Sequence, residues 1–339
     1  MTDYMSTSQL YTLLDCGNGK KLEKFGQFLI IRPCPQAMWQ PFKPDFWNLF
    51  DLEFVRTTEE KGEWRPNPSG PNNLYKLPPN WQINSPNGLV WSIEPNDFGN
   101  VGVFFEHWEY AESLVSFFAN SQENLENAQN LDSPKSDLET TKKNIELGVE
   151  NWDESQFNKS SEQNLTNDSK LANSKIKILN LFTYSGSNCV ALVKKNLSIT
   201  AVDSSKTAMD LYNKNLENNK LSREGQRMIL EDVDKFVERE IRREAKYDGI
   251  MIDAPSYGRG RKGELFKIEE SLVSLLKNCK KILKSNGKLV LTLHSPRFTP
   301  KILEILVGQI FEKKVECNEI LQKCQSGVLL PSGFLVKVG

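Results

Sequence analysis

Three aspartates stand at or next to the ends of short apolar runs, and a turn of small residues, 183–187, follows a fourth such run. The aspartates are Asp203, Asp232 and Asp253. Apolar runs of this length are typical of strands buried in a parallel sheet, and such sheets bind ligands at the carboxyl ends of their strands. A carboxylate at that edge accepts hydrogen bonds from hydroxyl and amino groups. The spacing therefore predicts a site that binds its ligand through these groups.

The segment 177–203 indicates what the ligand is. It is ordered as strand, tight turn, helix, strand and carboxylate, which is the order of a nucleotide-binding βαβ unit. The turn lacks GxGxxG and the chain has no GxxxxGK[ST], so a binding site for a pyrophosphate group is poorly supported. We expect a nucleoside without phosphates, with Asp203 on the ribose, Asp232 near an adenine amine and Gly186 allowing close backbone approach. A helix N-cap or a solvated loop position is the alternative for each acid.

The third aspartate begins a second motif, DAPSYG, at residues 253–258. Its carboxylate is placed to accept a hydrogen bond from a substrate amine, and the proline stiffens the turn. The tyrosine offers a face on which a base can stack. An ordinary proline turn is the alternative. The candidate catalytic residues are Asp253, Pro255, Ser256 and Tyr257.

A basic, glycine-rich segment follows this motif at once. Arg259, Arg261 and Lys262 could bind the phosphates of a polyanionic substrate. A solvated flexible loop is the alternative interpretation.

The order of the predicted elements gives the fold that must position these groups. From residue 175 to 339, five apolar strands alternate with helices, and two final strands bridged by 326–333 complete the chain. This alternation predicts an α/β fold with a doubly wound parallel sheet. Residues 1–118 are predicted to form a small β-rich domain. The polar segment 119–174 cannot bury enough apolar surface to fold and is predicted to be a linker, with a charged interaction arm as the alternative.

Bulk composition excludes several classes of protein. The 339 residues carry 43 Lys and Arg against 44 Asp and Glu, so the chain is not a strongly basic nucleic-acid binder, although a local basic patch is compatible with this. Six cysteines without a CxxC pair indicate reduced thiols. With two histidines, a His-rich metal site is not expected, and no metal is predicted. No apolar run has the length of a signal core or a membrane span, so we expect a soluble, cytoplasmic protein.

The motifs at residues 180–186 (NLFTYSG), 201–205 (AVDSS) and 253–258 (DAPSYG) resemble those of class I S-adenosylmethionine-dependent methyltransferases. Within these, they are similar to the branch that contains the 23S ribosomal RNA cytosine-5 methyltransferases, which shows NLFxYTG, VDxS and DPPS(Y/F)G. Segments 13–23 and 326–333 resemble one uncharacterised subgroup. The resemblance implies a Rossmann-like methyltransferase sheet and S-adenosylmethionine as the cofactor. The implied cofactor-binding residues are Asn180, Phe182, Tyr184, Ser185, Gly186, Asp203, Ser204 and Asp232.

Three departures from this branch bear on the reaction. Ala254 replaces the first proline of DPPS. The cytosine-5 enzymes carry a nucleophilic cysteine after the fifth strand, whereas this chain has His294 there, which is not an equivalent nucleophile. Phe105 and Glu106 stand where relatives have a segment that caps the cofactor, and His107 follows them in place of a glutamine; we interpret it as a packed or surface residue. Cytosine-5 methylation is therefore disfavoured.

Three functions remain open from the sequence. The first is methyl transfer from S-adenosylmethionine to RNA, with ribosomal RNA as the substrate and Asp253 orienting an acceptor amine. The second is methylation of a protein or a small molecule by the same fold. The third is a binding or assembly factor without turnover; an NAD-type Rossmann protein is disfavoured because the glycine fingerprint is missing. The acceptor atom and the oligomeric state do not follow from the sequence.

Overall fold

The computed structural model describes residues 10–58, 61–72, 81–119, 176–195, 197–259 and 265–339. The chain divides into two compact units, of which the first combines Met1–Val115 with Lys177–Gly339 and the second is Ser116–Ile176. The predicted linker, 119–174, lies outside the described residues except for its first residue. All that follows concerns the first unit, and its division into domains at residue 118 stays a prediction.

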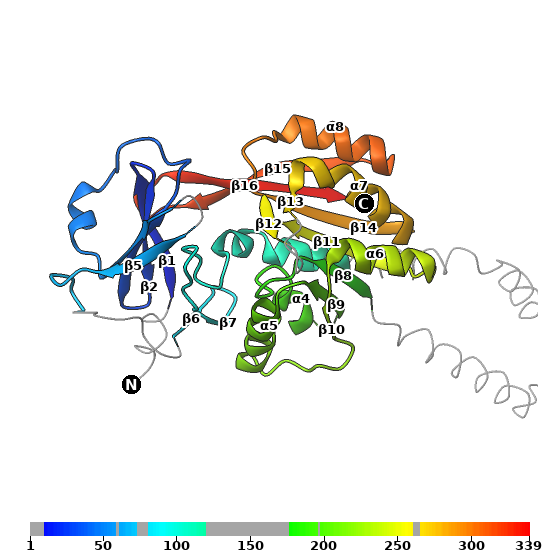
Figure 1. Cartoon of the computed structure of the whole chain (residues 1–339), viewed down its shortest axis with the longest axis horizontal. Helices are drawn as coiled ribbons and strands as arrows, with labels where there is room; N and C mark the ends of the chain where they lie inside the picture. The colour runs from blue at the N-terminus through cyan, green and yellow to red at the C-terminus, as the bar shows by residue number, and fades with distance from the viewer. Residues whose placement is uncertain (1–9, 59–60, 73–80, 120–175, 196, 260–264) are drawn as a thin grey trace, which may run out of the picture. The chain divides into compact units, whose positions relative to one another are not determined.

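A seven-stranded sheet forms the centre of the C-terminal half (Figure 1). Its order is β10-β9-β8-β11-β14-β16-β15, and the four pairs among the first five strands are parallel. The last two pairs, β14 with β16 and β16 with β15, are antiparallel. This confirms the predicted doubly wound sheet. The strands are β8 (Lys177–Leu181), β9 (Ser198–Asp203), β10 (Arg227–Leu230), β11 (Tyr247–Ala254), β14 (Leu283–Leu293), β15 (Val315–Lys323) and β16 (Leu329–Val338).

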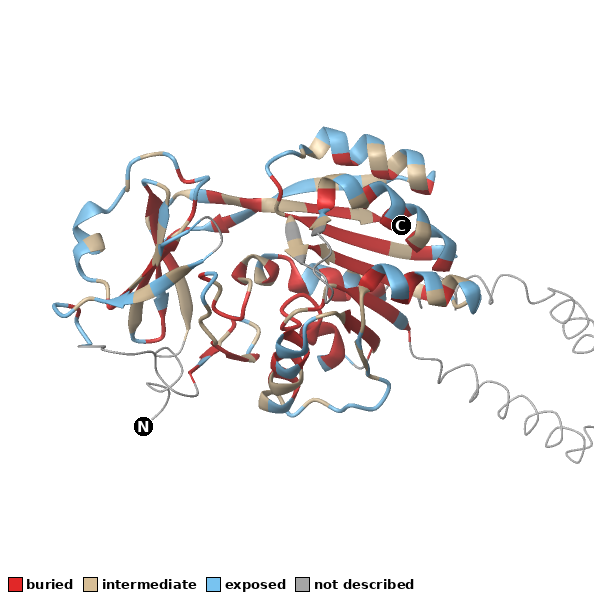
Figure 2. Ribbon diagram, in the orientation of Figure 1, coloured by how far each residue is buried: buried red, intermediate tan, exposed pale blue. Residues whose placement is uncertain are grey.

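The helices between these strands form because apolar residues recur at helical spacing, and polar side chains cap the first turns of α5, α6 and α8. Ser205 Oγ accepts from Ala208 N at the start of α5, and Thr299 caps α8 in the same way. Along α7, Leu272, Leu275 and Cys279 are buried in a core cluster shared with α6, α8 and the central strands. Figure 2 shows these strands buried along most of their length. The helices are α4 (Val190–Lys194), α5 (Lys206–Asn218), α6 (Val233–Arg242), α7 (Ile268–Ile282) and α8 (Pro300–Phe311).

The register of the central strands brings their carboxyl ends to one level. Leu181 of β8 lies opposite Val202 of β9 on one side and Ile252 of β11 on the other. The turn after β8, the last residue of β9 and Asp253 of β11 therefore follow at neighbouring positions. The chain leaves β8 for β9 and β10 on one side and crosses to β11 on the other, so this is the point at which the strand order reverses.

The N-terminal residues form a separate five-stranded sheet in the order β1-β2-β3-β4-β5, with one parallel pair, β3 and β4. Asn18 and Gly19 both have positive φ, 53° and 73°, and join β1 to β2 as the turn signal predicts. The elements are β1 (Tyr11–Gly17), β2 (Lys20–Phe25), β3 (Phe28–Pro33), β4 (Leu52–Arg56), β5 (Gly62–Pro66), the short pair β6 (Gln82–Asn84) and β7 (Val90–Ser92), and the 3-10 helices η2 (Pro44–Asn48) and η3 (Phe105–Glu109). A small hairpin of β12 (Tyr257–Arg259) and β13 (Leu265–Lys267) follows β11.

The final hairpin differs from the prediction. Its connection is 324–328 rather than 326–333, because Pro331 pairs with Leu321 and Gly333 lies inside β16. A register shift between Glu319 and Leu321 accommodates this pairing. The turn of the hairpin reaches β1, where Gln325 N donates to Leu13 O at 2.8 Å. The last two strands thus join the two sheets.

Candidate active site

The turn after β8 holds an unfavourable backbone conformation. Phe182 and Tyr184 have φ of 59° and 49°, a region that bulky side chains rarely adopt and that costs roughly 1–3 kcal/mol per residue. Thr183 fixes the turn: its N–H donates to Val202 O at 3.1 Å, and its hydroxyl donates to Asn180 O at 3.0 Å. Because the strain lies where the sheet binds ligands, it supports the predicted location of the site.

Asp203 ends β9 beside this turn. Its Oδ2 accepts from Tyr184 N at 2.9 Å and its Oδ1 from Ser205 N at 2.8 Å. Burial raises the pKa of Asp203, and the backbone N–H groups of Ser205, Tyr184 and Ser204 offset this only in part. A carboxylate has about four acceptor positions, so it can still accept from a vicinal diol. The position and the free acceptor capacity fit the predicted ribose contact.

Two predicted cofactor residues pack against other side chains, and a third has an unpaired hydroxyl. Asn180 is buried and exchanges two side-chain hydrogen bonds of 3.1 Å with Asn188. A Cβ on Gly186 would lie 2.3 Å from the Tyr212 ring, so the open side of this glycine faces a side chain rather than a ligand. Ser185 is buried, and its Oγ has no hydrogen-bond partner among the described residues. An unpaired buried hydroxyl in this turn is suited to a ligand contact.

Asp232 caps α6, because its side chain accepts from Lys235 N at 3.1 Å. The structure therefore shows the alternative that the sequence left open for this residue, and its contact with adenine stays a prediction. The ring of Phe182 packs against that of Phe266, and the ring of Tyr184 packs against that of Phe104. The ring centroids are 5.3 Å apart in both pairs. Both side chains are thus held by packing near the turn.

Asp253 is mostly buried, and both histidines of the chain lie beside it. His107 Nε2 is 3.2 Å from Oδ2, and His294 Nε2 is 3.5 Å from Oδ1. Thr292 Oγ1 donates to Oδ1 from the neighbouring strand β14. Burial raises the pKa of Asp253, but His107 and His294 outweigh burial and hold it well below its usual range. The carboxylate is therefore ionised and anchored from two sides.

His294 directly follows β14 and is positioned by β16. Its Nδ1 lies 2.7 Å from Ser332 O, and a Cβ on Gly333 would lie 2.8 Å from that nitrogen, so glycine makes room for the ring. Burial lowers the pKa of His294, but the hydrogen bond to Asp253 and the charge of Glu106 raise it to about 9. Below that pH the ring is an imidazolium paired with a carboxylate.

The sequence does not predict that both histidines lie beside Asp253. His107 is buried, as expected of a packed residue, and in addition its Nδ1 lies 3.0 Å from Ser187 Oγ and its Nε2 faces Asp253. Its position near the site could have been predicted because it directly follows Phe105-Glu106, a segment that the resemblance brings near the cofactor. His294 follows the fifth strand and so had to lie at the same edge as Asp253.

The DAPSYG motif forms the exit from β11. Pro255 is exposed, and Ser256 O accepts from Ile268 N at 3.3 Å, which joins the motif to the start of α7. The backbone of Tyr257 and Arg259 pairs with β13. The predicted phosphate-binding residues Arg261 and Lys262 lie outside the described residues.

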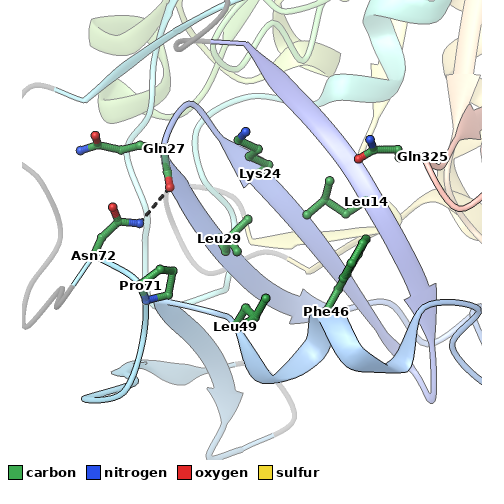
Figure 3. A pocket seen from close by; sticks show the side chains of 9 residues that line it. All are labelled: Leu14, Lys24, Gln27, Leu29, Phe46, Leu49, Pro71, Asn72 and Gln325. Carbon is green, nitrogen blue, oxygen red and sulfur yellow. Dashed lines mark hydrogen bonds between the residues drawn. The ribbon is translucent and has the colours of Figure 1, made fainter.

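A cavity of about 400 Å³ lies away from these strand ends, on the N-terminal sheet (Figure 3). Leu14, Leu29, Leu49 and Pro71 give it an apolar wall, and Asn72 donates to Gln27 O at 2.9 Å at its rim. None of the predicted site residues lines it. We therefore place the chemistry at the strand ends and not in this cavity.

Residues 181–307 match the family model described as rRNA (uridine-N3-)-methyltransferase, BMT5-like, which is less than half of the chain. Similar segments occur in ribosomal RNA large subunit methyltransferase K/L of Syntrophotalea carbinolica, 32% identical over 122 residues, and of Pseudoalteromonas atlantica, 34% identical over 115 residues. These matches cover 35% and 33% of this chain. They cover 17% and 16% of the relatives, so the chain spans only about a sixth of their length.

Solved structures match over nearly the whole chain. The S-adenosylmethionine-dependent methyltransferase from Agrobacterium tumefaciens is 25% identical with a TM-score of 0.73, covering 98% of this chain and 91% of that chain. A second methyltransferase, solved with S-adenosylhomocysteine, has 17% identity and a TM-score of 0.61, covering 99% and 77% of the two chains, and shows the same fold.

The sheet order and these similarities show that the chain has the fold of the S-adenosylmethionine-dependent methyltransferases, and its strand-end carboxylates fit that cofactor. It is related to the ribosomal RNA large subunit K/L enzymes and to the BMT5-like family. Membership of the cytosine-5 branch stays a prediction. No helix among the described residues has the length and apolarity to cross a membrane.

Proposed function

We propose that this methyltransferase acts on ribosomal RNA, with Asp203 binding the cofactor ribose and Asp253 with its histidines facing the acceptor. The observation that carries the proposal is the common level of the Tyr184 turn, Asp203 and Asp253 on three adjacent strands. A cofactor whose sugar is bound by Asp203 on β9 would lie across these strand ends, next to Asp253 on β11.

The cofactor would be bound by the turn after β8 and by the carboxylates next to it. The free hydroxyl of Ser185 and the spare acceptor positions of Asp203 are the groups with unused hydrogen-bonding capacity there. In this proposal Asn180 and Gly186 act indirectly, by fixing the backbone of the turn. Phe182, Tyr184 and Ser204 would line the methionine and ribose side, and Asp232 would reach adenine with the oxygen that its N-cap does not use.

The acceptor would lie at the Asp253 side. Thr292 and His294 take up to two of about four acceptor positions on this carboxylate, so capacity remains for an acceptor amine. Methyl transfer would convert the sulfonium of the cofactor into the neutral thioether of S-adenosylhomocysteine, and the acceptor amine would release one proton to water, so the protein mainly aligns and desolvates the acceptor. His294 stands where the cytosine-5 mechanism needs a thiol, and this supports a nitrogen acceptor over carbon-5.

RNA is favoured because the matched family model and the curated relatives are both described as ribosomal RNA methyltransferases. Tyr257 would stack on a base, with Pro255 and Ser256 shaping the turn that carries it. Arg259, Arg261 and Lys262 would contact phosphates. A cytoplasmic location follows from this substrate.

The cofactor site is tested with Asp203→Ala in isothermal titration with S-adenosylmethionine. Loss of hydrogen bonds to a charged group costs about 1.5–3 kcal/mol, so affinity should fall roughly 10- to 100-fold. Asp210→Ala is the matched control, because this carboxylate is exposed on α5 and pairs only with Lys206 among the described residues. Unchanged affinity in Asp203→Ala would contradict the proposed cofactor site.

The substrate is tested separately. Ribosomal RNA from a strain that lacks the protein should accept labelled methyl groups from purified enzyme, and mass spectrometry of its nucleosides should show one methylated product. Labelling of ribosomal protein instead of RNA would refute the RNA proposal and leave the cofactor site intact.

A further inference from the structure

Two histidines are too few for a His-rich metal site, yet the fold brings both of them to one carboxylate. His107 comes from η3, Asp253 from β11 and His294 from the end of β14. One potential ligand atom from each lies within 4.8 Å of the others. The three residues are called the His-Asp-His cluster below.

The distance from each histidine to Asp253 is close to the distance between ligands around a single ion. Ligand atoms at about 2.0–2.1 Å from a tetrahedral zinc ion lie roughly 3.3–3.4 Å from one another. His107 Nε2 and Asp253 Oδ2 are 3.2 Å apart, and His294 Nε2 and Asp253 Oδ1 are 3.5 Å apart. Small side-chain adjustments would place all three around one ion.

One nitrogen in the cluster is unsatisfied. His107 is 1% exposed, and its Nε2 makes no hydrogen bond of acceptable angle with any described residue although it faces Asp253. A buried polar atom without a hydrogen-bond partner destabilises a fold. A metal ion at the centre of the cluster would satisfy this nitrogen, whereas the carboxylate alone does not.

The outer nitrogens of both rings are held as metal-binding histidines usually are. His294 Nδ1 lies 2.7 Å from Ser332 O, and since a carbonyl only accepts, Nδ1 carries a proton, which leaves Nε2 as the nitrogen that would bind a metal ion in exchange for its own proton. His107 Nδ1 is likewise engaged by Ser187 Oγ at 3.0 Å. Both Nε2 atoms are thereby oriented toward the same point.

We propose that the His-Asp-His cluster binds one divalent transition-metal ion of the zinc, iron or manganese type on the acceptor side of the sheet. Two imidazoles and one carboxylate select such ions over magnesium or calcium, which prefer oxygen ligands. Glu106 is not a ligand of this ion, because its Oε1 lies 3.8 Å from the outer nitrogen of His294. Three protein ligands leave a coordination position for an oxygen or nitrogen of the acceptor. Only this role, and not the site itself, rests on the proposed function.

The test uses the full chain, freed of metal by a chelator and titrated with Zn²⁺ or Co²⁺. We expect one ion per chain and a Co²⁺ absorption spectrum of nitrogen and oxygen ligands. His294→Gln should weaken binding at least about 100-fold, since even changes of outer-shell partners cost 10- to 100-fold. Zn²⁺ should raise the melting temperature of the wild type and not that of the variant.

Asp203→Asn is the matched control and should retain the ion while binding S-adenosylmethionine more weakly. The buried position of His107 makes its variants prone to misfolding, so the partly exposed His294 carries the test. Absence of binding, unchanged affinity in His294→Gln, or a thiolate band in the Co²⁺ spectrum would overturn the inference. Each result leaves the separately measured affinity for S-adenosylmethionine, and hence the proposed function, untouched.

Discussion

Two buried carboxylates, Glu23 in the N-terminal sheet and Asp253 in the methyltransferase sheet, have different kinds of partner. Arg32 holds Glu23 through two hydrogen bonds of 2.6 and 2.7 Å, and Lys21 and Tyr11 add contacts of 3.2 and 2.8 Å. A guanidinium cannot lose its proton in a protein, whereas the imidazole of His294 beside Asp253 can. The first cluster is therefore a fixed structural ion pair, and the second can change its protonation and accept a ligand.

The largest effect is expected from Glu23→Gln. The change leaves Arg32 buried without its counter-ion, and breaking a buried pair in this way costs about 3–5 kcal/mol. Urea unfolding measures this loss. Glu53→Gln is the control, because Glu53 pairs with the exposed Lys20 at the surface and should cost less than about 1 kcal/mol. Equal losses of unfolding free energy in the two variants would show that the Glu23–Arg32 pair is not stronger than the Glu53–Lys20 pair.

The same pair predicts how stability depends on pH. Burial raises the pKa of Glu23, but Arg32 and Lys21 outweigh burial and lower it from 4.5 to about 2. A depressed folded-state pKa stabilises the fold above pH 4.5, and this contribution, about 3 kcal/mol, is lost as the pH falls toward 2. Unfolding measured across this window should show the loss in the wild type and not in Glu23→Gln. Parallel curves for the two proteins would exclude Glu23 as the titrating group.

Asp253→Asn should reduce the rate of methyl transfer strongly and the stability of the fold only slightly. His294 can give up its proton when the carboxylate is replaced, so the fold should lose only about 1–2 kcal/mol. Methyl transfer should fall about 100-fold, because alignment of the acceptor is lost. Single-turnover transfer from labelled S-adenosylmethionine measures this, with cofactor affinity as the internal control. An activity loss no greater than the loss of folded protein would make Asp253 a structural residue like Glu23.

The smallest effect is expected from Tyr11→Phe. It keeps the ring stacked on Phe105 and removes only the hydrogen bond to Glu23, so it should cost about 1 kcal/mol. Thr292→Val makes the matched change at Asp253. If the two carboxylates differ as argued, Tyr11→Phe changes stability alone, while Thr292→Val also lowers the rate of transfer.

The sequence predicted the methyltransferase sheet well because its strands and helices are locally coded. Apolar runs, the Ser205 cap and the position of Asp203 are all readable within a few residues. The His-Asp-His cluster was not predicted, since it depends on three segments that are distant along the chain and meet only through the strand order. The connection of the last hairpin was also misplaced, because Pro331 and Gly333 usually mark turns and here continue a strand next to His294.

The hairpin of β15 and β16 has a consequence for how the molecule is assembled. Its turn bonds to β1 through Gln325 and packs Cys324 against Cys16, while its second strand supplies the carbonyl that orients His294. During translation, β1 is synthesised before any other described strand and β16 after all the others. Contacts between such distant segments form slowly. In a nascent chain the parallel strands of the sheet would therefore pair before His294 is positioned beside Asp253. The protein would have no methyl-transfer activity until β16 had been synthesised.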